Sequence, residues 1–319
     1  MDGAADSYQA RFAARWGHLV EPHVRALAWL LDAPDLLDVA DPYWLGKIAT
    51  LGAPPPAVVA WLNRLDADPG PLLDFLGTRN HTRLGLYAEK LMAFYFAEQG
   101  VLVAHGLQVR ASRNDTVGEF DFLLDAGADG VEHIEFATKL YLLQGDSAAR
   151  FDTFVGPNLA DTLGKKMRKV IERQLTLGTH PAAQAILPRP VLRARALIKG
   201  WLFYPSGSVT PTGGISPLHC RGFWCALDEV GPLVTALAGA RFVVLPRLQW
   251  LAPYRARADA QVFDRDALHA HLVRQFDALP APVLVAVVVE QDGVLCETAR
   301  GFVVPDDWRT RAALRAASL

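Results

Sequence analysis

The stretch from Val117 to Leu143, VGEFDFLLDAGADGVEHIEFATKLYLL, predicts two strands joined by a tight turn. Apolar and polar residues alternate within each half, as in strands that bury one face. Two glycines supply the turn between the halves. If Asp121 lies opposite Glu135, the loop spans about Ala126–Gly130, which is a common length for a hairpin. The sequence therefore predicts a β-hairpin in this register.

Four charged residues fall on one face of this hairpin: Glu119, Asp121, Glu135 and Lys139. The proposed register brings the Cβ atoms of Asp121 and Glu135 within about 5 Å of each other. Like charges that close destabilise a sheet unless a cation lies between them. The hairpin therefore predicts a divalent-metal site. Glu119 is either a third acidic ligand or a surface residue at the end of its strand, and we expect His133 to be a core or rim residue.

The composition is that of a globular protein with a sizeable core. The chain has 319 residues, of which 51% are hydrophobic and 21% charged, enough for one large domain or two ordinary ones. A net charge of −2 argues weakly against a nucleic-acid-binding protein, because such proteins often carry a basic excess. No apolar run reaches the roughly 20 residues of a membrane span, and the N-terminus lacks the pattern of a secretory signal. We therefore expect a cytoplasmic protein without membrane contact.

The three cysteines do not predict a zinc site. Cys220, Cys225 and Cys296 lack the CxxC spacing of paired zinc ligands. We expect them to be buried, reduced thiols.

Helical and extended segments flank the hairpin in a definite order. Thr82 is expected to cap a helix from about Arg83 to Gln99, which carries Glu89 beside its apolar stripe. A strand at Val101–Arg110 precedes the hairpin. Further segments follow it: a helix at Asp161–Thr176, a strand at Val191–Tyr204, a helix at Leu227–Leu237, a strand at Arg241–Leu245, a helix at Asp264–Leu279, and strands at Val283–Glu290 and Leu295–Val304.

This order divides the chain into three parts and predicts a mixed α/β fold. Residues 1–80 read as an N-terminal helical extension and residues 81–204 as the core. Residues 205–319 read as a C-terminal α/β lobe that begins with a Gly/Pro/Ser-rich stretch.

The segment from Asp161 to Gly200 is strongly basic. It holds nine lysine and arginine residues against Asp161 and Glu172, a local balance of +7. A block of this kind can neutralise phosphate groups, and it can equally be a solvated helix face. The candidate nucleic-acid-binding residues lie on its helix: Lys165, Lys166, Arg168, Lys169, Arg173 and Gln174.

The order of elements and the positions of the acids resemble the PD-(D/E)XK nuclease superfamily, whose core is an αβββαβ unit with a mixed sheet. The resemblance implies that Asp121 and Glu135 bind Mg²⁺ or Mn²⁺ and that Glu89 reaches the metal directly or through water. It implies that Lys139 orients or polarises the attacking water, and that Gln174 occupies a region where some members carry a functional glutamine. The catalytic set is then Asp121, Glu135, Lys139 and Glu89.

More locally, the chain resembles the uncharacterised bacterial family called domain of unknown function 1853. Several stretches between about residues 26 and 308 carry this resemblance: ALAWLLDAPDLL, GEFDFLL, HIEFATKLYLL, GWLFYP, HCRGFW, LPRLQWLAP and RGFVVPDDW. It brings no established activity with it.

The chain departs from the superfamily pattern at the lysine. The pattern places lysine two residues after the acid, where this chain has Ala137, whereas Lys139 lies four residues after it. Either Lys139 leans back along its strand, or Lys165 or Lys166 of the next helix takes its place, or the site only binds. GEFD in place of a PD dipeptide is a lesser departure.

Two functions are therefore expected from the sequence. The first is a Mg²⁺-dependent phosphodiesterase that acts on nucleic acid, with DNA as the favoured substrate. The second is a catalytically inactive nucleic-acid-binding or protein-interaction module on the same fold.

Overall fold

The computed structural model describes residues 7–78, 81–113, 115–145, 151–205, 213–230 and 240–317. The strands are β1 (Leu102–Ser112), β2 (Asp115–Asp125), β3 (Val131–Leu143), β4 (Phe154–Val155), β5 (Val191–Tyr204), β6 (Cys220–Ala226), β7 (Arg241–Val244), β8 (Arg255–Arg257), β9 (Val283–Gln291) and β10 (Val294–Val304). The helices are α1 (Tyr8–Trp16), α2 (Pro22–Asp32), α3 (Pro56–Ala67), α4 (Gly70–Leu76), α5 (Leu84–Glu98), α6 (Leu163–Lys169), α7 (Pro181–Gln184), α9 (Arg265–Ala278) and α10 (Trp308–Ala317).

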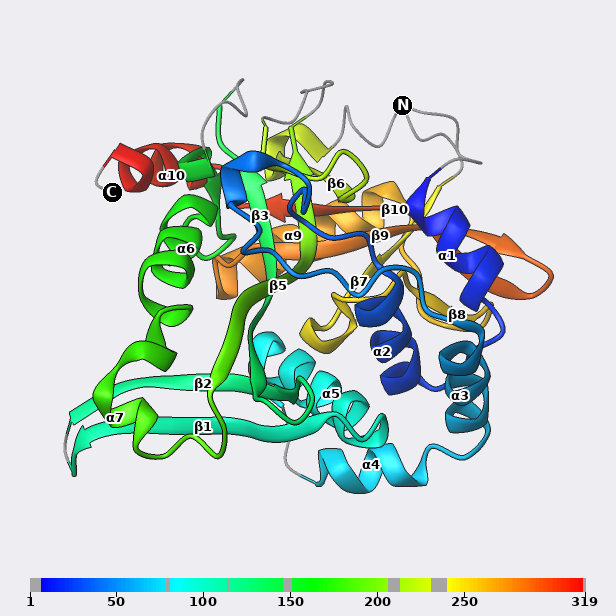
Figure 1. Ribbon diagram of the computed structural model, residues 1–319. Helices are drawn as coiled ribbons and strands as arrows, with labels where there is room; N and C mark the ends of the chain where they lie inside the picture. The colour runs from blue at the N-terminus through cyan, green and yellow to red at the C-terminus, as the bar shows by residue number, and fades with distance from the viewer. Residues whose placement is uncertain are drawn as a thin grey trace.

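These elements form a mixed α/β protein, as the sequence predicts. Within the described ranges ten strands share one sheet in the order β1-β2-β3-β5-β6-β10-β9-β7, while β4 pairs with β3 and β8 pairs with β10. The sheet is strongly twisted: β3 and β5 run up the view in Figure 1, whereas β9 and β10 run across it. The hairpin of β1 and β2 extends from the lower part of the molecule as a long ribbon.

The hairpin at the centre of the chain forms with the predicted turn and register. β2 ends at Asp125 and β3 begins at Val131, so the connecting loop covers residues 126–130. The antiparallel ladder runs from Asp125–Val131 to Phe122–Ile134. This register is the predicted one, and the ladder ends one step before the predicted pair of Asp121 and Glu135. On its other side β3 pairs in parallel with β5, from Val131–Val191 to Leu142–Phe203.

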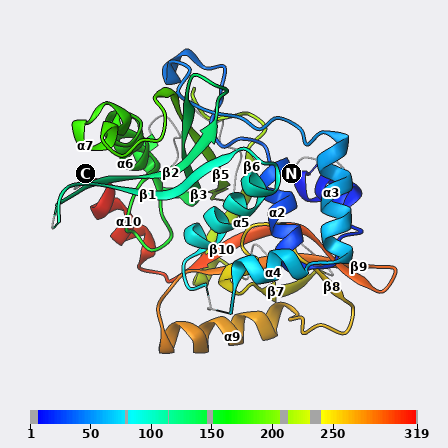
Figure 2. The same ribbon diagram turned by 60° about the horizontal axis from the view of Figure 1, so that its bottom comes forward.

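Helices cover both faces of the sheet around β3. The residues of α2 and α5 join one hydrophobic cluster with Phe122, Ile134 and Phe136. The residues of α6 join another with Ala137 and Tyr141, which lie on the opposite face of β3. α9 packs on β7 and β9 at the far end of the sheet, as Figure 2 shows. β3 is therefore buried on both faces.

The N-terminal boundary of α5 differs from the prediction. The helix begins at Leu84 with Arg83 as its N-cap, and no side chain makes a capping hydrogen bond. The prediction that Thr82 caps it was therefore wrong. Gly100 follows the helix with a φ of +69°, in the left-handed region that favours glycine after a helix end.

The α-helix predicted at Asp161–Thr176 is shorter than expected and continues as a π-helix. Its α-helical part is α6, capped by Thr162, whose hydroxyl accepts a hydrogen bond from Lys165 N at 3.1 Å. A π-helical segment, η4 (Val170–Gln174), follows directly. The prediction of one regular helix was wrong at this point, and the difference matters for the site described below.

The C-terminal predictions are confirmed where the structure describes them. β5 has the predicted bounds, and α9, β7, β9 and β10 lie within a few residues of theirs. Residues 227–229 of the helix predicted at Leu227–Leu237 form a 3-10 turn; most of the remainder lies outside the described residues, as does most of the Gly/Pro/Ser-rich stretch. β5 pairs with β6, so one sheet crosses the predicted boundary at residue 204. The division into three parts stays a prediction.

The expectations about membrane spans and about the cysteines can be compared with the described residues. None of their helices is both long and apolar enough to span a membrane. All three cysteines are free, and Cys220 and Cys225 are buried, as expected; Cys296 is only partly buried.

Gly200 is required by the close approach of β3 and β5. A Cβ atom at this position would meet the backbone oxygen of Lys139 at 2.0 Å. We expect Gly200→Ala to lower the free energy of unfolding by about 1–3 kcal/mol, because the two paired strands would have to move apart. Gly85→Ala is the matched control: nothing lies within 4 Å of its Cβ position on α5, so alanine should stabilise by roughly 0.5–1 kcal/mol. Urea unfolding measures both, and equal effects would contradict this account.

Candidate functional site

β2 and β3 separate directly before the two acids. The ladder between them ends at Phe122–Ile134. Two residues beyond Ile134, the amide of Phe136 donates a hydrogen bond to Asp121 Oδ2, at 2.9 Å. A side-chain carboxylate therefore satisfies a backbone donor of β3 where the described ladder has stopped.

The separation also breaks the predicted alternation of β2. The Phe122 ring lies 5.2 Å from that of Phe96 in the cluster under α5. The Phe120 ring instead packs edge-on against His133 at 4.8 Å and belongs to a different cluster. Regular alternation would place Phe120 and Phe122 on one face, so the expected alternation is wrong here, because β2 no longer follows β3 at this point.

Glu135 is the most deeply buried acid of the predicted set, with only 1% of the residue exposed. Its Oε1 atom accepts hydrogen bonds from the side-chain amide of Gln174 and, at 3.5 Å, from Lys166 Nζ. Lys166 Nζ also donates to Gln174 Oε1 at 3.3 Å. The sequence named all three residues as candidates, and the structure brings them together.

The π-helical segment explains why Lys166 and Gln174 reach the same carboxylate. Eight residues of a regular α-helix would leave their side chains about 80° apart around the axis. η4 has a wider turn, marked by the hydrogen bond from Leu175 N to Val170 O. This wider turn reduces the angle, so both side chains point at β3.

Burial raises the pKa of both carboxyls. For Glu135 the main cause is desolvation, and the charge of Asp121 adds to it, while Lys166 opposes the shift. The pKa of Asp121 is also raised by desolvation; its hydrogen bond from Phe136 opposes the shift and the charge of Glu89 adds to it. The acids Glu89, Asp121 and Glu135 therefore lie close enough to interact electrostatically.

Glu89 and Glu119 have partners on β1. Glu89 Oε1 accepts a hydrogen bond from His105 Nε2 at 2.9 Å, and the His105 ring stacks on Phe122. The exposed Glu119 carboxylate lies 3.4 Å from Gln108 Nε2. Glu89 is thus held where its charge acts on Asp121, whereas Glu119 makes its contact on the surface of the β1–β2 hairpin.

Lys139 forms its hydrogen bond with Asp161 and not with Glu135. Its Nζ atom donates to Asp161 Oδ2 at 2.7 Å, and the Tyr141 hydroxyl donates to the same oxygen at 3.2 Å. The lysine in contact with Glu135 is Lys166, one of the two substitutes named from the sequence. Asp161 was not recognised as a partner, because only the packing of the loop before α6 against β3 brings it there.

Three buried side-chain atoms at this site lack a hydrogen-bond partner among the described residues. They are Glu135 Oε2 and both ring nitrogens of the fully buried His133. His133 Nε2 lies 4.0 Å from Glu135 Oε2. Unsatisfied buried oxygens are rare in proteins, and a bound ion is one established reason for them.

The donor set fits a hard cation held by few protein ligands. Among the described residues no group of three or more His, Cys, Asp or Glu side chains is arranged to hold a metal ion. Two adjacent carboxylates are nevertheless available, and Mg²⁺ is usually held by one or two carboxylates with water and phosphate oxygens as its other ligands. Asp121 and Glu135 are the residues that could hold it.

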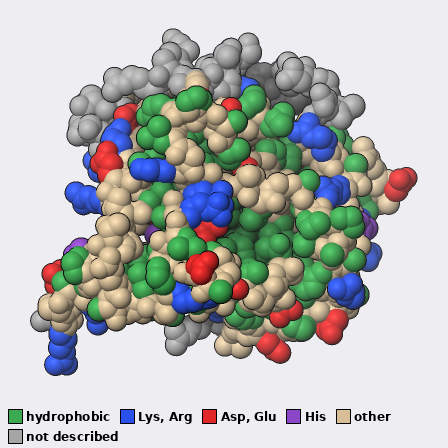
Figure 3. Space-filling view, viewed as in Figure 1, with side chains coloured by type: hydrophobic (Ala, Val, Ile, Leu, Met, Phe, Trp, Pro, Cys, Tyr) green, Lys and Arg blue, Asp and Glu red, His purple; other side chains and the backbone are tan. Residues whose placement is uncertain are grey.

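Basic side chains surround this site on the α6 side. Lys165, Lys169 and Arg173 are exposed. Arg168 is exposed too, but it forms a two-pronged contact with Asp152, with both distances 3.0 Å. In Figure 3, lysine and arginine side chains gather at the border of the face where α6 lies. Of the predicted nucleic-acid-binding set, four cations are thus exposed, one of them paired with Asp152, and two residues, Lys166 and Gln174, contact Glu135.

The raised pKa of Glu135 predicts that the metal-free protein loses stability as the pH rises. A carboxyl whose pKa is higher in the folded state holds a proton that the unfolded chain releases, so the free energy of unfolding falls above its ordinary pKa. Burial lowers the pKa of His133 to about 4; this effect has the opposite sign but is complete above about pH 6.5.

We therefore expect the wild type to become less stable between about pH 6.5 and 8 without divalent cations, and Glu135→Gln to remove most of that slope. Urea unfolding at several pH values measures it. Parallel curves for the two proteins would contradict the assigned burial.

Comparison with known proteins identifies the family but no activity. No curated protein matches the chain, and no solved structure matches it. The family model described as Domain of unknown function (DUF1853) matches residues 25–304. This range contains α5, the whole hairpin, α6 and most of the C-terminal half. The chain therefore belongs to the DUF1853 family.

Proposed function

We propose that this protein is a Mg²⁺-dependent phosphodiesterase that cleaves nucleic acid, with DNA as the favoured substrate. The observation that carries the proposal is the contact of Lys166 and Gln174 with a buried carboxylate, Glu135, beside Asp121. Acids, a lysine and an amide at one point of a sheet are the groups that metal-assisted hydrolysis requires.

The order of elements around the site supports the same proposal. α5 precedes three antiparallel strands, β1, β2 and β3; α6 follows, and β5 then pairs in parallel with β3. This is the αβββαβ order of the PD-(D/E)XK core, with Glu89 on the helix, Asp121 on the second strand and Glu135 on the third. We propose a restriction-endonuclease-like core on this basis.

In this proposal each side chain has a distinct task. Asp121 and Glu135 hold the cation, and Gln174 fixes the orientation of the Glu135 carboxylate. The Lys166 ammonium lies beside that carboxylate, where it can orient the attacking water and stabilise charge on the phosphate. Glu89 contributes negative charge next to Asp121 and is itself held by His105.

The cation supplies the chemistry that these side chains lack: it lowers the pKa of a bound water and stabilises the charge that develops on the phosphorus. Because both carboxyls have raised pKa values in its absence, a divalent cation would also relieve the repulsion between them. Mn²⁺ has similar ligand preferences and is the natural alternative.

The exposed cations of α6 and η4 provide the contact with substrate. Lys165, Lys169 and Arg173 follow one another at intervals of four residues, and phosphate neutralisation by such residues releases counterions. We propose that they hold the backbone of the nucleic acid beside Lys166. The binding should therefore weaken as the salt concentration rises.

One observation favours a second function, a catalytically inactive nucleic-acid-binding or protein-interaction module. Lys139, the lysine on the strand of Glu135, is engaged by Asp161, and Glu135 already has a lysine as partner without a metal. Such an ion pair would suffice to hold a non-catalytic fold together. Calorimetric titration with Mg²⁺ and Mn²⁺ separates the two functions: binding of neither cation would favour the module.

The assignment of Lys166, and not Lys139, as the catalytic lysine gives the most direct test of the proposed nuclease activity. On labelled single- and double-stranded DNA and RNA with Mg²⁺, we expect Lys166→Met, Asp121→Asn and Glu135→Gln each to lower the cleavage rate by at least about 100-fold, because each removes a group that stabilises the transition state. Lys139→Met is the matched control, since its ammonium lies with Asp161; it should retain most of the activity.

Two outcomes would count against this proposal. Equal cleavage by the wild type and the Asp121→Ala/Glu135→Ala double variant would identify a contaminating nuclease. Loss of activity in Lys139→Met with full activity in Lys166→Met would reverse the roles of the two lysines. Chelation with EDTA should abolish cleavage, and added Mg²⁺ should restore it.

A further inference from the structure

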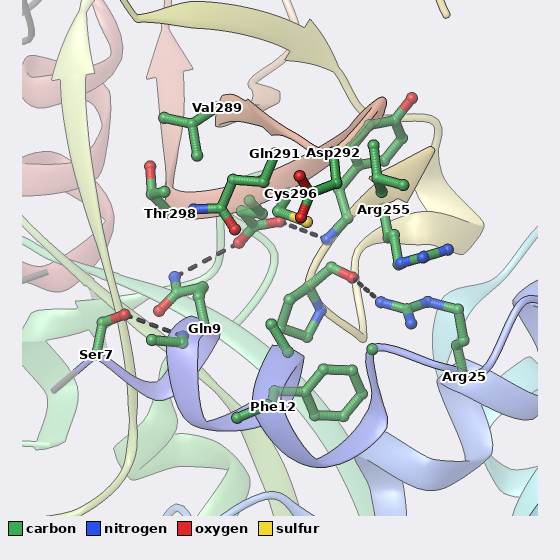
Figure 4. A pocket seen from close by; sticks show the side chains of 18 residues that line it. Ser7, Gln9, Phe12, Arg25, Arg255, Val289, Gln291, Asp292, Cys296 and Thr298 are labelled. Carbon is green, nitrogen blue, oxygen red and sulfur yellow. Dashed lines mark hydrogen bonds between the residues drawn. The ribbon is translucent and has the colours of Figure 1, made fainter. Parts of the chain in front are cut away.

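A cavity of about 700 Å³ lies apart from the acids, between α1, the segment leading into β8 and the β9–β10 hairpin. Its volume falls within the roughly 300–1,000 Å³ of small-molecule sites. The apolar part of its lining includes Phe12, Tyr254, Val289 and Val294. Figure 4 shows the cavity, with Arg25 and Arg255 at one end of it.

Arg25 is a buried cation without an ion-pair partner among the described residues. Only 7% of it is exposed. Its guanidinium donates to three backbone oxygens: those of Trp16 at 3.2 Å, Leu19 at 3.1 Å and Pro253 at 2.9 Å. These oxygens satisfy its hydrogen bonds but do not neutralise its charge, and an uncompensated buried charge is costly.

Arg255 places a second positive charge beside the first. It is the first residue of β8, partly buried, and it lines the same cavity. Burial lowers the pKa of Arg25 to about 10, and the charge of Arg255 contributes in the same direction. In the part of the chain that the structure describes, Arg255 forms no ion pair either. Two neighbouring guanidinium groups therefore repel each other at one end of the cavity.

The nearby acids do not form ion pairs with Arg25 or Arg255 in the described part of the chain. Glu297 is buried, but its two oxygens are taken by Arg300, at 2.7 and 2.8 Å, and by Gln9 and Tyr254 N. Asp292 lies at the exposed turn of the β9–β10 hairpin, and no ion pair joins it to Arg25 or Arg255 within the described ranges. Asp66 also acts on Arg25 electrostatically, but its carboxylate accepts the Val20 and Glu21 amides. Within the described ranges no acid forms an ion pair with Arg25 or Arg255 at this end of the cavity.

We propose that this cavity binds a small organic anion, with its carboxylate or phosphate group at Arg255 and Arg25 and its apolar body against Phe12, Val289 and Val294. An anion would relieve the repulsion between the two guanidinium groups, which are well suited to pair with either kind of group. The cavity walls would cover the apolar part. The site is independent of the proposed nuclease centre.

The test uses two fluorescent probes of similar shape, 8-anilinonaphthalene-1-sulfonate and the uncharged N-phenyl-1-naphthylamine. The intact protein should bind the sulfonate at one saturable site and the neutral probe at least about tenfold more weakly, because only the sulfonate pairs with guanidinium. Benzoate and phenyl phosphate are then added as competitors, and the stronger one identifies the preferred anion.

Arg255→Gln should weaken sulfonate binding by at least about fivefold and leave the neutral probe unaffected. Arg255 is preferred to Arg25 for this purpose because it is partly exposed, so its replacement should not prevent folding. Arg257→Gln is the matched control on the same strand: its side chain is 89% exposed and lies 3.6 Å from Asp259. This control should bind the sulfonate as the wild type does.

The thiol of Cys296 reports where the probe binds. Cys296 lines the cavity and is partly exposed, whereas Cys220 and Cys225 are buried. Saturation with the sulfonate should slow the alkylation of Cys296 by N-ethylmaleimide, measured by mass spectrometry. Equal affinity for the two probes, unchanged binding to Arg255→Gln or unprotected Cys296 would each overturn the proposal.

Discussion

The parallel pairing of β3 with β5 is the constraint on which the rest of the site depends. It runs along almost the whole of β3, while α5 and α6 cover the two faces of the sheet. An acid on such a strand has no water to solvate it, so it must be protonated, paired or bound to a cation. Glu135 meets this condition through Lys166 and Gln174, which is why the packing of α6 and the chemistry of the site cannot be separated.

The hairpin could be predicted from the sequence because its signals are local. Alternation, turn glycines and repulsion between carboxylates act over a few residues, and together they gave the correct loop and the register next to Asp121. The departure of β2 from β3 after Phe122 could not be predicted in the same way. It depends on the pairing of β2 with β1 and on the Phe136 amide, which donates to the Asp121 side chain and not to the backbone of β2.

The side chains that complete the site were harder to assign for a related reason. A regular helix from Asp161 to Thr176 would not have placed Lys166 and Gln174 side by side. The local sequence carries no signal that predicts the π-helical turn. The ion pair of Lys139 with Asp161 likewise joins residues that only tertiary packing brings together. A charged residue can thus be recognised as a candidate from its strand, whereas its partner is decided by the element packed against it.

The hydrogen bonds of the two central acids also limit how they could coordinate a metal. Asp121 gives one oxygen to the Phe136 amide, and Glu135 gives one to Lys166 and Gln174. Each carboxylate would therefore offer its other oxygen most readily to a cation. Because Mg²⁺ is octahedral, two such acids would leave ligand positions to water and to the oxygens of a phosphate. A site of this kind would hold its metal weakly alone and more firmly once a substrate supplies the missing ligands.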